Sequence, residues 1–587
     1  MPGRAALAGV VAACLLATSC GGATEAPASG SGSAKPPTVE SLGLTAEAGE
    51  SGLDDAGEPQ RGGSITYGLE GETSGGFCLP SAQLAASGMT VARALYDPLT
   101  APNAEGGYVP YLAETVTHDP DFRTWTLTLR SGITFHDGTP LTAEVVKNNL
   151  DAYRGAYPGR DSQLFALALS NIAGVTVEGP LTVEVATKVP WVAFPSYLGG
   201  ARLGMMAQAQ LDDPTSCARK PIGTGPFRFV SWTPNTELVV ERNDRYWQEA
   251  PDGKPYPYLD RIEFRPVPDV GVRTDGLRAG DLDVIHTSSM GAIARDLRPL
   301  RDQGKANLFV SQEAAEVAFI MVNHTRPPFD DLRIRKALVM SIDRDKSNQT
   351  DNDGLGTLAT GPFAPGTMGY LEDSGFPGYD LDEAKRLVAD YEADGAEAKT
   401  TLSIANDPTL SIQAEALQQR LKTVGIDVDI VVRDETSLIN DAIAKQYQSM
   451  FVRNFAGGDP DSLYLWWYSG TTAPDGTFTP NLLNFPGTKD AEIDRLLDEG
   501  RSEPDPTARR KVYEALNRRM AEQVVAAWTF YTPWGIAEVP SVHDVLGPPL
   551  PRGGDGEASD VDPDDPARRP SRNLSAGNPL LGMWKER

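Results

Sequence analysis

The segment Ile426-Asp427-Val428-Asp429-Ile430-Val431-Val432 alternates apolar with charged residues, the pattern of a β-strand that buries one face. It follows Gly425 and a helical pattern over residues 410–424, and Thr401-Leu402-Ser403-Ile404 forms a strand pattern ahead of that helix. A strand, a helix and a strand in this order make a β-α-β unit, which favours a parallel pair with a right-handed crossover. The segment therefore predicts an α/β fold.

Strand and helix patterns continue on both sides of this unit. Alternation over residues 124–130, a Ser131-Gly132 turn and Ile133-Thr134-Phe135 predict a hairpin, and Thr142 is the expected N-cap of the helix after it. Further strands are expected at 61–68 and in the pairs 175–177 with 181–185 and 227–230 with 238–240; helices are expected at 332–342, 381–391 and 506–525. The body therefore alternates sheet and helix.

Composition limits the function classes. The chain has 587 residues, with 80 Asp plus Glu against 53 Lys plus Arg, a formal charge of −27. A nucleic-acid binder needs a basic face to displace counterions from phosphate, so this balance argues against a nucleic-acid partner. The length favours two to four domains, and 40% apolar residues with 58 Gly and 46 Pro indicate a globular chain rich in turns.

The amino terminus has the pattern of an export signal over residues 1–20. Arg4 precedes an apolar run at residues 5–16, which is shorter than the about 20 residues of a spanning helix. Leu16-Ala17-Thr18-Ser19-Cys20-Gly21-Gly22 resembles a bacterial lipobox, with Ala17 where Leu is usual, so we expect Cys20 to be lipidated. The alternative is plain secretion with cleavage nearby. Residues 21–60 are rich in Gly, Ser, Ala and Pro and predict a flexible tether.

The cysteine count is consistent with export. Of four cysteines, Cys14 lies in the signal and Cys20 is the lipidation candidate, which leaves Cys78 and Cys217. Two cysteines in the body of an exported protein suggest one disulfide. Two free buried thiols are the alternative.

Catalytic and metal-binding patterns are not found. The five histidines are isolated from one another, and the chain contains no Gly-x-Ser-x-Gly elbow and no phosphate-binding loop of the Gly-x(4)-Gly-Lys-Ser/Thr type. The pairs Asp281/Asp283 and Asp459/Asp461 could serve as glycosidase carboxylates, but among 80 acids such pairs arise by chance and are expected to be solvated turns. We expect no enzyme, no cofactor and no metal site; an exported hydrolase remains the alternative of another class.

Five phrases, in order, resemble the peptide/nickel-type family 5 extracellular solute-binding proteins of bacterial ABC importers. They are WTLTLRSGITFHDGTPLTA (125–143), PIGTGPF (221–227), RNDRYW (242–247), DLRIRKAL with SIDR (331–344) and GDPD (458–461). Together they cover about residues 61–540. Five phrases in register make a specific match.

The resemblance implies a two-lobed, type II periplasmic-binding-protein-like fold whose hinge strands join the lobes around a ligand cleft. The implied domains are lobe I at 61–310, with a subdomain at about 100–215, lobe II at 311–535, and a return to lobe I at 536–587 with an acidic loop at 553–566. The implied function is capture of oligopeptides or similar polar solutes for an ABC permease, by a monomer lipid-anchored at the extracytoplasmic face of the cell membrane. A non-peptide solute, either an oligosaccharide or a metal chelate, is the alternative.

The resemblance implies that two loops, at residues 75–79 and 453–461, contact the ligand. In peptide-binding relatives an Asp three residues before the Asp-Pro pair holds the ligand's ammonium group, and Ala456 stands at that position here. A buried ammonium without a carboxylate is costly, so either Asp459 takes this role or the ligand has no free amine there. The four aromatic residues at 464–468 either stack on ligand or pack in the core. The expected ligand-binding residues are Gly76, Phe77, Arg453, Asn454, Asp459 and Trp466.

Overall fold

The computed structural model describes residues 57–73, 75–82, 84–162, 165–406, 408–454, 458–472, 476–554 and 566–587. The predicted signal, Cys20 and most of the tether lie outside the described residues, as do Ala456 and most of the acidic loop. No helix within the described ranges is long and apolar enough to cross a membrane.

The strands of the described part are short except for two. They are β1 (Ser64–Leu69), β2 (Thr100–Pro102), β3 (Tyr108–Pro110), β4 (Ala113–His118), β5 (Thr124–Leu129), β6 (Ile172–Gly179), β7 (Thr182–Thr187), β8 (Phe227–Thr233), β9 (Glu237–Arg242), β10 (Arg261–Pro266), β11 (Val284–Thr287), β12 (Asn307–Val322), β13 (Thr357–Leu358), β14 (Lys399–Ala405), β15 (Asp427–Arg433), β16 (Ser449–Asn454), β17 (Gly470–Thr472), β18 (Phe478–Pro480), β19 (Ala527–Glu538), β20 (Val542–His543) and β21 (Trp584–Lys585).

The helices in the described part are α1 (Ala86–Leu95), α2 (Ala143–Tyr153), α3 (Phe165–Ala168), α4 (Phe194–Tyr197), α5 (Gln208–Asp212), α6 (Val270–Ala279), α7 (Met290–Ala292), α8 (Arg298–Asp302), α9 (Leu332–Met340), α10 (Arg344–Asp351), α11 (Leu381–Ala393), α12 (Pro408–Lys422), α13 (Glu435–Ile443), α14 (Leu463–Trp467), α15 (Ala491–Ser502) and α16 (Pro506–Glu522). Five of these helices, α2, α9, α11, α12 and α16, match predicted segments to within about three residues at each end. The Thr142 hydroxyl accepts the N–H of Val145, so Thr142 caps α2 as predicted.

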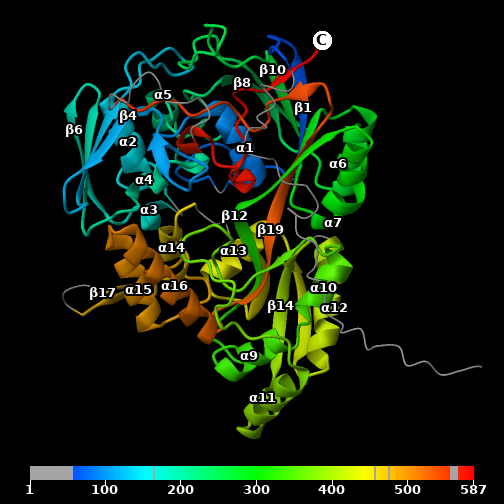
Figure 1. Ribbon diagram of the computed structural model, residues 1–587. Coiled ribbons are helices and arrows are strands. Elements are labelled where there is room, and N and C mark those ends of the chain that lie inside the picture. Colours follow the sequence, from blue (N-terminus) through cyan, green and yellow to red (C-terminus); the bar gives the residue numbers. More distant parts are fainter. Residues whose placement is uncertain are drawn as a thin grey trace, which may run out of the picture. The chain divides into compact units, whose positions relative to one another are not determined.

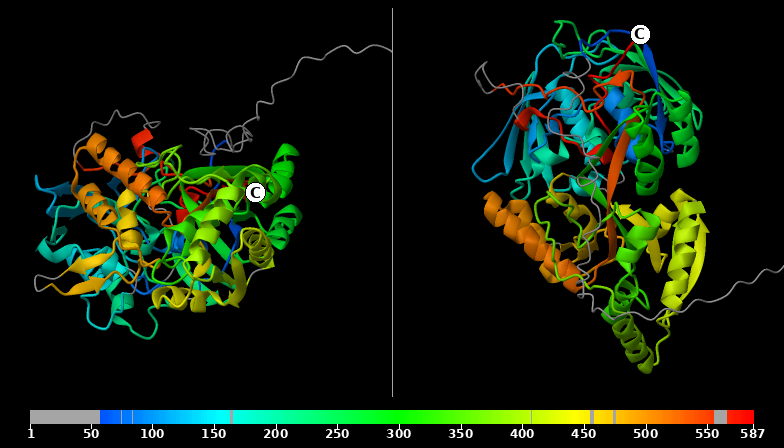
Figure 2. Two further views of the ribbon diagram at one scale, coloured as in Figure 1. Left: turned by 90° about the horizontal axis from the view of Figure 1, so that it is seen from below. Right: turned by 45° about the vertical axis from the view of Figure 1, so that its right-hand side comes forward.

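Two long antiparallel strands, β12 and β19, form the centre of the main sheet. The order of this sheet is β15-β14-β16-β12-β19-β11-β1-β10-β9-β8, and β13 also pairs with β19. β12 pairs with β16 through residues 317–322, whereas β19 pairs with β11 through residues 535–538. Figures 1 and 2 show β19, in orange, beside β12 and between the two halves of the sheet. The two strands thus connect the halves of this α/β sheet in the way expected of the hinge strands that the resemblance implies.

The register of this strand pair shifts between Ser311 and Glu316. Ala314 in the middle of that stretch has φ 44°, a left-handed conformation that L-residues with a side chain rarely adopt. An irregularity of this kind bends a strand and redirects side chains. It lies just before residues 317–322 of β12, which pair with β16 along one side while residues 316–320 still pair with β19 along the other.

The β-α-β unit is confirmed. β14 and β15 are parallel, with Lys399 opposite Asp427 and Ala405 opposite Arg433, and α12 connects them. Gly425 has φ 93°, which a glycine adopts without strain at the end of a helix. The hairpins β6–β7 and β8–β9 are also confirmed by their antiparallel pairing.

The hairpin predicted from residues 124–135 is wrong. β5 forms, but its antiparallel partners are β4 and β7, in a separate sheet of order β4-β5-β7-β6. Residues 133–141 instead close on themselves, because Leu141 N–H donates to the Ile133 carbonyl and Phe135 N–H to the Thr139 carbonyl. Alternation identified β5 correctly, but it carries no information about which strand pairs with it.

The carboxyl-terminal residues return to the first half of the sheet. Leu580, Met583 and Trp584 are buried, β21 pairs with β20, and Lys585 forms an ion pair with Asp283 at 2.7 Å. The apolar chain end thus docks on the body. The lobe boundaries at residues 310 and 535 remain predictions.

Candidate functional site

Two polar residues lie together at the carboxyl ends of two neighbouring parallel strands, inside the main sheet. Glu70 comes directly after β1 and Ser288 directly after β11, and these strands pair in parallel with Tyr67 opposite Val284. The carboxyl ends of parallel strands lie on the same side of a sheet, and α/β proteins commonly hold ligands just beyond them. Glu70 accepts both the backbone N–H of Ser288, at 2.7 Å, and its hydroxyl, at 3.1 and 3.2 Å.

Arg453 reaches the carboxyl end of β11 from the other half of the sheet. It lies on β16, and its Nη1 donates to Ser288 Oγ at 2.6 Å. The guanidinium carbon lies 5.8 Å from the ring centre of Trp534 on β19, and Nη1 is 3.9 Å from Glu316 Oε2 on β12. The Arg453 side chain nevertheless stays 45% exposed. This predicted ligand residue therefore joins β16, both hinge strands and the end of β11 in one polar cluster.

The two glutamates of the cluster have opposite pKa shifts. Burial would raise the pKa of Glu70, but the charges of Arg453 and Arg273 and the Ser288 N–H hold it below its ordinary value. Burial dominates at Glu316 and raises its pKa, against the lowering effects of Arg453 and of the Trp534 indole, whose Nε1 donates to Oε2 at 3.2 Å. Neighbouring cations and donors thus keep Glu70 ionised. At Glu316 the same kinds of neighbour do not offset the effect of burial, so its ionised form is disfavoured.

His286, on β11, is a structural neighbour of the cluster. Its Nε2 lies 3.0 Å from the backbone N of Glu70, which donates to it, and burial lowers the pKa of His286 to about 4. The imidazole is therefore neutral at pH 7 and anchors the backbone at Glu70.

Asp459, another predicted ligand residue, already has a cationic partner. Arg509 on α16 donates to both of its carboxylate oxygens, at 2.7 and 2.9 Å, and Asp459 also accepts the N–H of Asp461 at 2.8 Å. A bidentate guanidinium–carboxylate pair satisfies the acid within the fold. This geometry favours the second sequence-based option, a ligand without a free amine at this point.

Asp461 is not the solvated turn residue that we expected. Its side chain is 0% exposed and pairs with Arg501 on α15 at 2.9 Å. Trp191 Nε1 and the Tyr197 hydroxyl donate to the same carboxylate, at 2.8 and 2.9 Å. Burial alone would raise the pKa of Asp461, but the charge of Arg501 and the hydrogen bonds from Arg501 and the Trp191 indole lower it overall.

The four aromatic residues at 464–468 differ in burial, and one of them is a core residue. Trp467 is buried against Phe319 and Trp528, and Tyr464 stacks on Tyr468 with ring centres 4.1 Å apart. Trp466 is only partly buried and lies edge-on to Phe485. Core packing therefore explains Trp467, whereas Tyr464, Trp466 and Tyr468 are partly buried against the same core.

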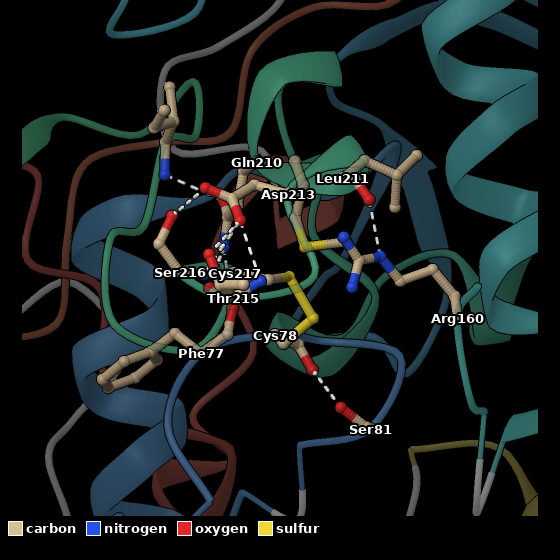
Figure 3. Close-up of a disulfide and its surroundings, with 12 residues drawn as sticks. Phe77, Cys78, Ser81, Arg160, Gln210, Leu211, Asp213, Thr215, Ser216 and Cys217 are labelled. Carbon is tan, nitrogen blue, oxygen red and sulfur yellow. Dashed lines mark hydrogen bonds between the residues drawn. A yellow bond between two sulfur atoms is a disulfide. The ribbon is translucent and has the colours of Figure 1, made fainter.

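Gly76 and Phe77 lie beside the disulfide. Cys78 and Cys217 form the predicted disulfide, with their Cα atoms 5.0 Å apart, as Figure 3 shows. The Phe77 N–H donates to the Ala218 carbonyl at 2.9 Å, and the Phe77 side chain is 1% exposed. A Cβ on Gly76 would lie 2.4 Å from the Ala218 carbonyl oxygen, so only glycine fits there. These contacts tie the loop to residues 217–218.

The predicted ligand residues therefore divide into separate groups. Arg453 lies in the Glu70–Ser288–Glu316 cluster, Asp459 with Arg509, and Trp466 with Phe485. Asn454 ends β16 opposite Val317. Among the described residues, no hydrogen bond, ion pair or ring contact joins Gly76 or Phe77 to Arg453.

Comparison with known proteins identifies the fold and the family. A sequence profile described as bacterial extracellular solute-binding proteins, family 5 middle region, matches residues 107–475. The chain belongs to this family.

Related proteins agree with the family 5 assignment. The glutathione-binding protein GsiB of Escherichia coli K12 is 26% identical over 463 residues, which cover 77% of this chain and 85% of GsiB. The binding protein AgaA from A. tumefaciens R10, solved with agropinic acid, is 25% identical with a TM-score of 0.73, covering 89% of this chain and 99% of AgaA. The oligopeptide-binding protein AppA from Bacillus subtilis, 21% identical with a TM-score of 0.72, covers 90% and 100% of the two chains and shows the same fold.

The family 5 assignment settles the class of function. Its members are extracytoplasmic solute-binding proteins of ABC importers rather than enzymes, as predicted.

Sequence reasoning missed Glu70, Ser288, Glu316 and Trp534 as members of the cluster. More than 200 residues separate Glu70 from Ser288, and no local pattern links them. A signal was nevertheless present for Glu70, because it follows the strand predicted at 61–68 by two residues, and ligands commonly bind where such strands end. Glu316 and Trp534 depend on the shifted register of β12 with β19, which sequence periodicity cannot give.

Proposed function

We propose that this family 5 protein captures short peptides or similar polar solutes and delivers them to the transmembrane subunits of an ABC permease. Arg453 carries the proposal, because it brings β16 into contact with the end of β11 over both hinge strands while 45% of its side chain stays exposed. A ligand bound there would contact both halves of the sheet and so favour their closure.

The relatives support small, polar, peptide-like ligands. GsiB is named for glutathione, a peptide derivative, and AppA was solved with a nonapeptide. We infer that ligands of this general class enter the cleft of this chain between the lobes bounded at residues 61–310, 311–535 and 536–587. The proposed working form is a monomer.

Attachment to the membrane is part of the proposal. Lipidation of Cys20 and a tether over residues 21–60 would hold the binding protein near its permease. The family assignment supports an extracytoplasmic location, and the lipobox-like residues 16–22 support the anchor.

A melting-temperature screen tests the ligand class. The protein is heated with a pool of two- to five-residue peptides and glutathione, and separately with pools of oligosaccharides and nickel chelates. A ligand at 100 times its Kd stabilises the native state by about 2.7 kcal/mol, which raises Tm by about 2 °C or more in a protein of this size. A shift with the peptide pool supports the proposal; a shift with only the sugar or chelate pool contradicts it.

A further inference from the structure

Three acidic residues in and around the cluster are already hydrogen-bonded to arginines within the fold. Asp459 is bidentate with Arg509, Asp461 is paired with Arg501, and Glu70 accepts from Arg273 Nη2 at 3.3 Å. A ligand ammonium would have to displace one of these guanidinium groups to reach any of the three carboxylates. The fourth acid, Glu316, is only 12% exposed, and its Oε2 accepts from Trp534.

Arg453 is in the opposite situation. A guanidinium has five N–H donors in a planar fork. In the described part of the chain, its only hydrogen bond is the one from Nη1 to Ser288 Oγ, at 2.6 Å. The nearest carboxylate oxygen, Oε2 of Glu316, is 3.9 Å away and beyond hydrogen-bond range, and that oxygen accepts from Trp534 instead. The cation thus keeps unused donors and 45% of its surface exposed at the meeting of the two halves.

Three partners fix the orientation of this guanidinium. Ser288 holds one end, the Trp534 ring lies under it at 5.8 Å, and Glu316 attracts it from the side. A held guanidinium loses little further freedom when it binds a planar anion through two parallel N–H groups.

Together these contacts support a specific ligand chemistry. We propose that Arg453 binds a carboxylate of the solute, and that the solute presents this acid, rather than an amine, to the β16 end of the cleft. This inference rests on the proposed function and specifies the chemical group that the site selects. A carboxylate suits the site better than a phosphate, because Glu70 and Glu316 lie close and a second negative charge would be repelled.

Paired probes separate the acid from the rest of the ligand. Glutathione and trialanine are titrated calorimetrically as free acids, and their carboxyl amides are titrated in parallel. Four proteins are compared: the wild type, Arg453→Gln, Arg453→Lys and Ser288→Ala. Arg495→Gln is the matched control, because Arg495 is an exposed arginine whose ion pairs lie on its own helix α15.

We expect the wild type to bind at least one free acid about 10- to 100-fold more tightly than its amide, and Arg453→Gln to lose that difference. Arg453→Lys should recover only part of it, because an ammonium cannot bind bidentately. Ser288→Ala should keep most of it, since it retains the guanidinium, and Arg495→Gln should match the wild type.

The outcomes distinguish this inference from the proposed function. Equal binding of acid and amide by the wild type, or tight acid binding by Arg453→Gln, would overturn the role of Arg453 while leaving a peptide-binding protein. No binding of any probe by the wild type would overturn both. Circular dichroism and Tm of each variant establish that it is folded.

Discussion

The indole of Trp191 donates its Nε1 hydrogen to Oδ2 of Asp461 over 2.8 Å, and 270 residues of sequence separate the two. Trp191 lies next to the separate sheet of β4, β5, β7 and β6, where its backbone N–H donates to the Phe122 carbonyl at 2.9 Å. Asp461 lies in a short 3₁₀ turn, Pro460–Ser462, between β16 and α14. The contact thus joins the small-sheet region to the segment that follows Arg453, with both partners buried.

Loss of one partner from this buried network should cost much of the protein's stability. Arg501→Gln leaves the fully buried Asp461 without its cation, so we expect the free energy of unfolding to fall by about 3–5 kcal/mol. Trp191→Phe removes one donor and should cost about 1–3 kcal/mol. Urea unfolding measures both. Arg495→Gln on the same helix should change stability by less than about 1 kcal/mol, and an equal loss in that variant would contradict the argument.

Asp459→Asn should affect the fold more than the ligand. The substitution removes the charge that pairs with Arg509 in the bidentate contact, so unfolding should become easier by about 3–5 kcal/mol. At a temperature where the variant stays folded, its Kd for the ligand should change by less than about threefold. A large loss of affinity with unchanged stability would show that Asp459 faces the ligand after all.

The buried Asp97 should make stability depend on pH. Burial raises its pKa to about 6, against hydrogen bonds from Trp247, Thr224 and Tyr246. Because the folded pKa lies above the unfolded value of about 3.9, the native state binds the extra proton, and stability falls as pH rises from about 4 to above 6. The loss is about 3 kcal/mol, since one pKa unit corresponds to about 1.4 kcal/mol. Asp97→Asn should remove this part of the pH dependence of urea unfolding between pH 4 and 7, and an unchanged dependence would contradict it.

The disulfide should resist labelling until it is reduced. Denatured, non-reduced protein treated with iodoacetamide should leave Cys78 and Cys217 unlabelled, and reduction should expose both. Cys217→Ser should lower the free energy of unfolding by about 2–5 kcal/mol, because the open loop gains conformational entropy when unfolded. Labelling of both cysteines before reduction would exclude the disulfide.

Local patterns predicted several elements and some of their pairings, but not all of their partners. Helices α11 and α12 and the parallel β14–β15 pair followed from periodicity and from Gly425, because each depends on residues close in sequence. β5 was found, but its partners β4 and β7 were not, since pairing depends on long-range packing of the two sheet faces.

The candidate site was only half predictable for the same reason. Arg453 came from a motif resemblance, whereas its partners Ser288 and Glu316 lie 165 and 137 residues away and meet it only in the folded sheet. Asp461 was misread as a solvated turn because a short acidic motif looks the same whether its charge is paired in the core or exposed.

Isothermal titration calorimetry of the full-length body with glutathione and with short peptides tests the solute-binding function most directly. We predict saturable, one-to-one binding of at least one of these solutes, with a negative heat-capacity change as apolar surface is buried on closure. No binding of any peptide or of glutathione, together with saturable binding of an oligosaccharide or a nickel chelate, would contradict the proposed ligand class.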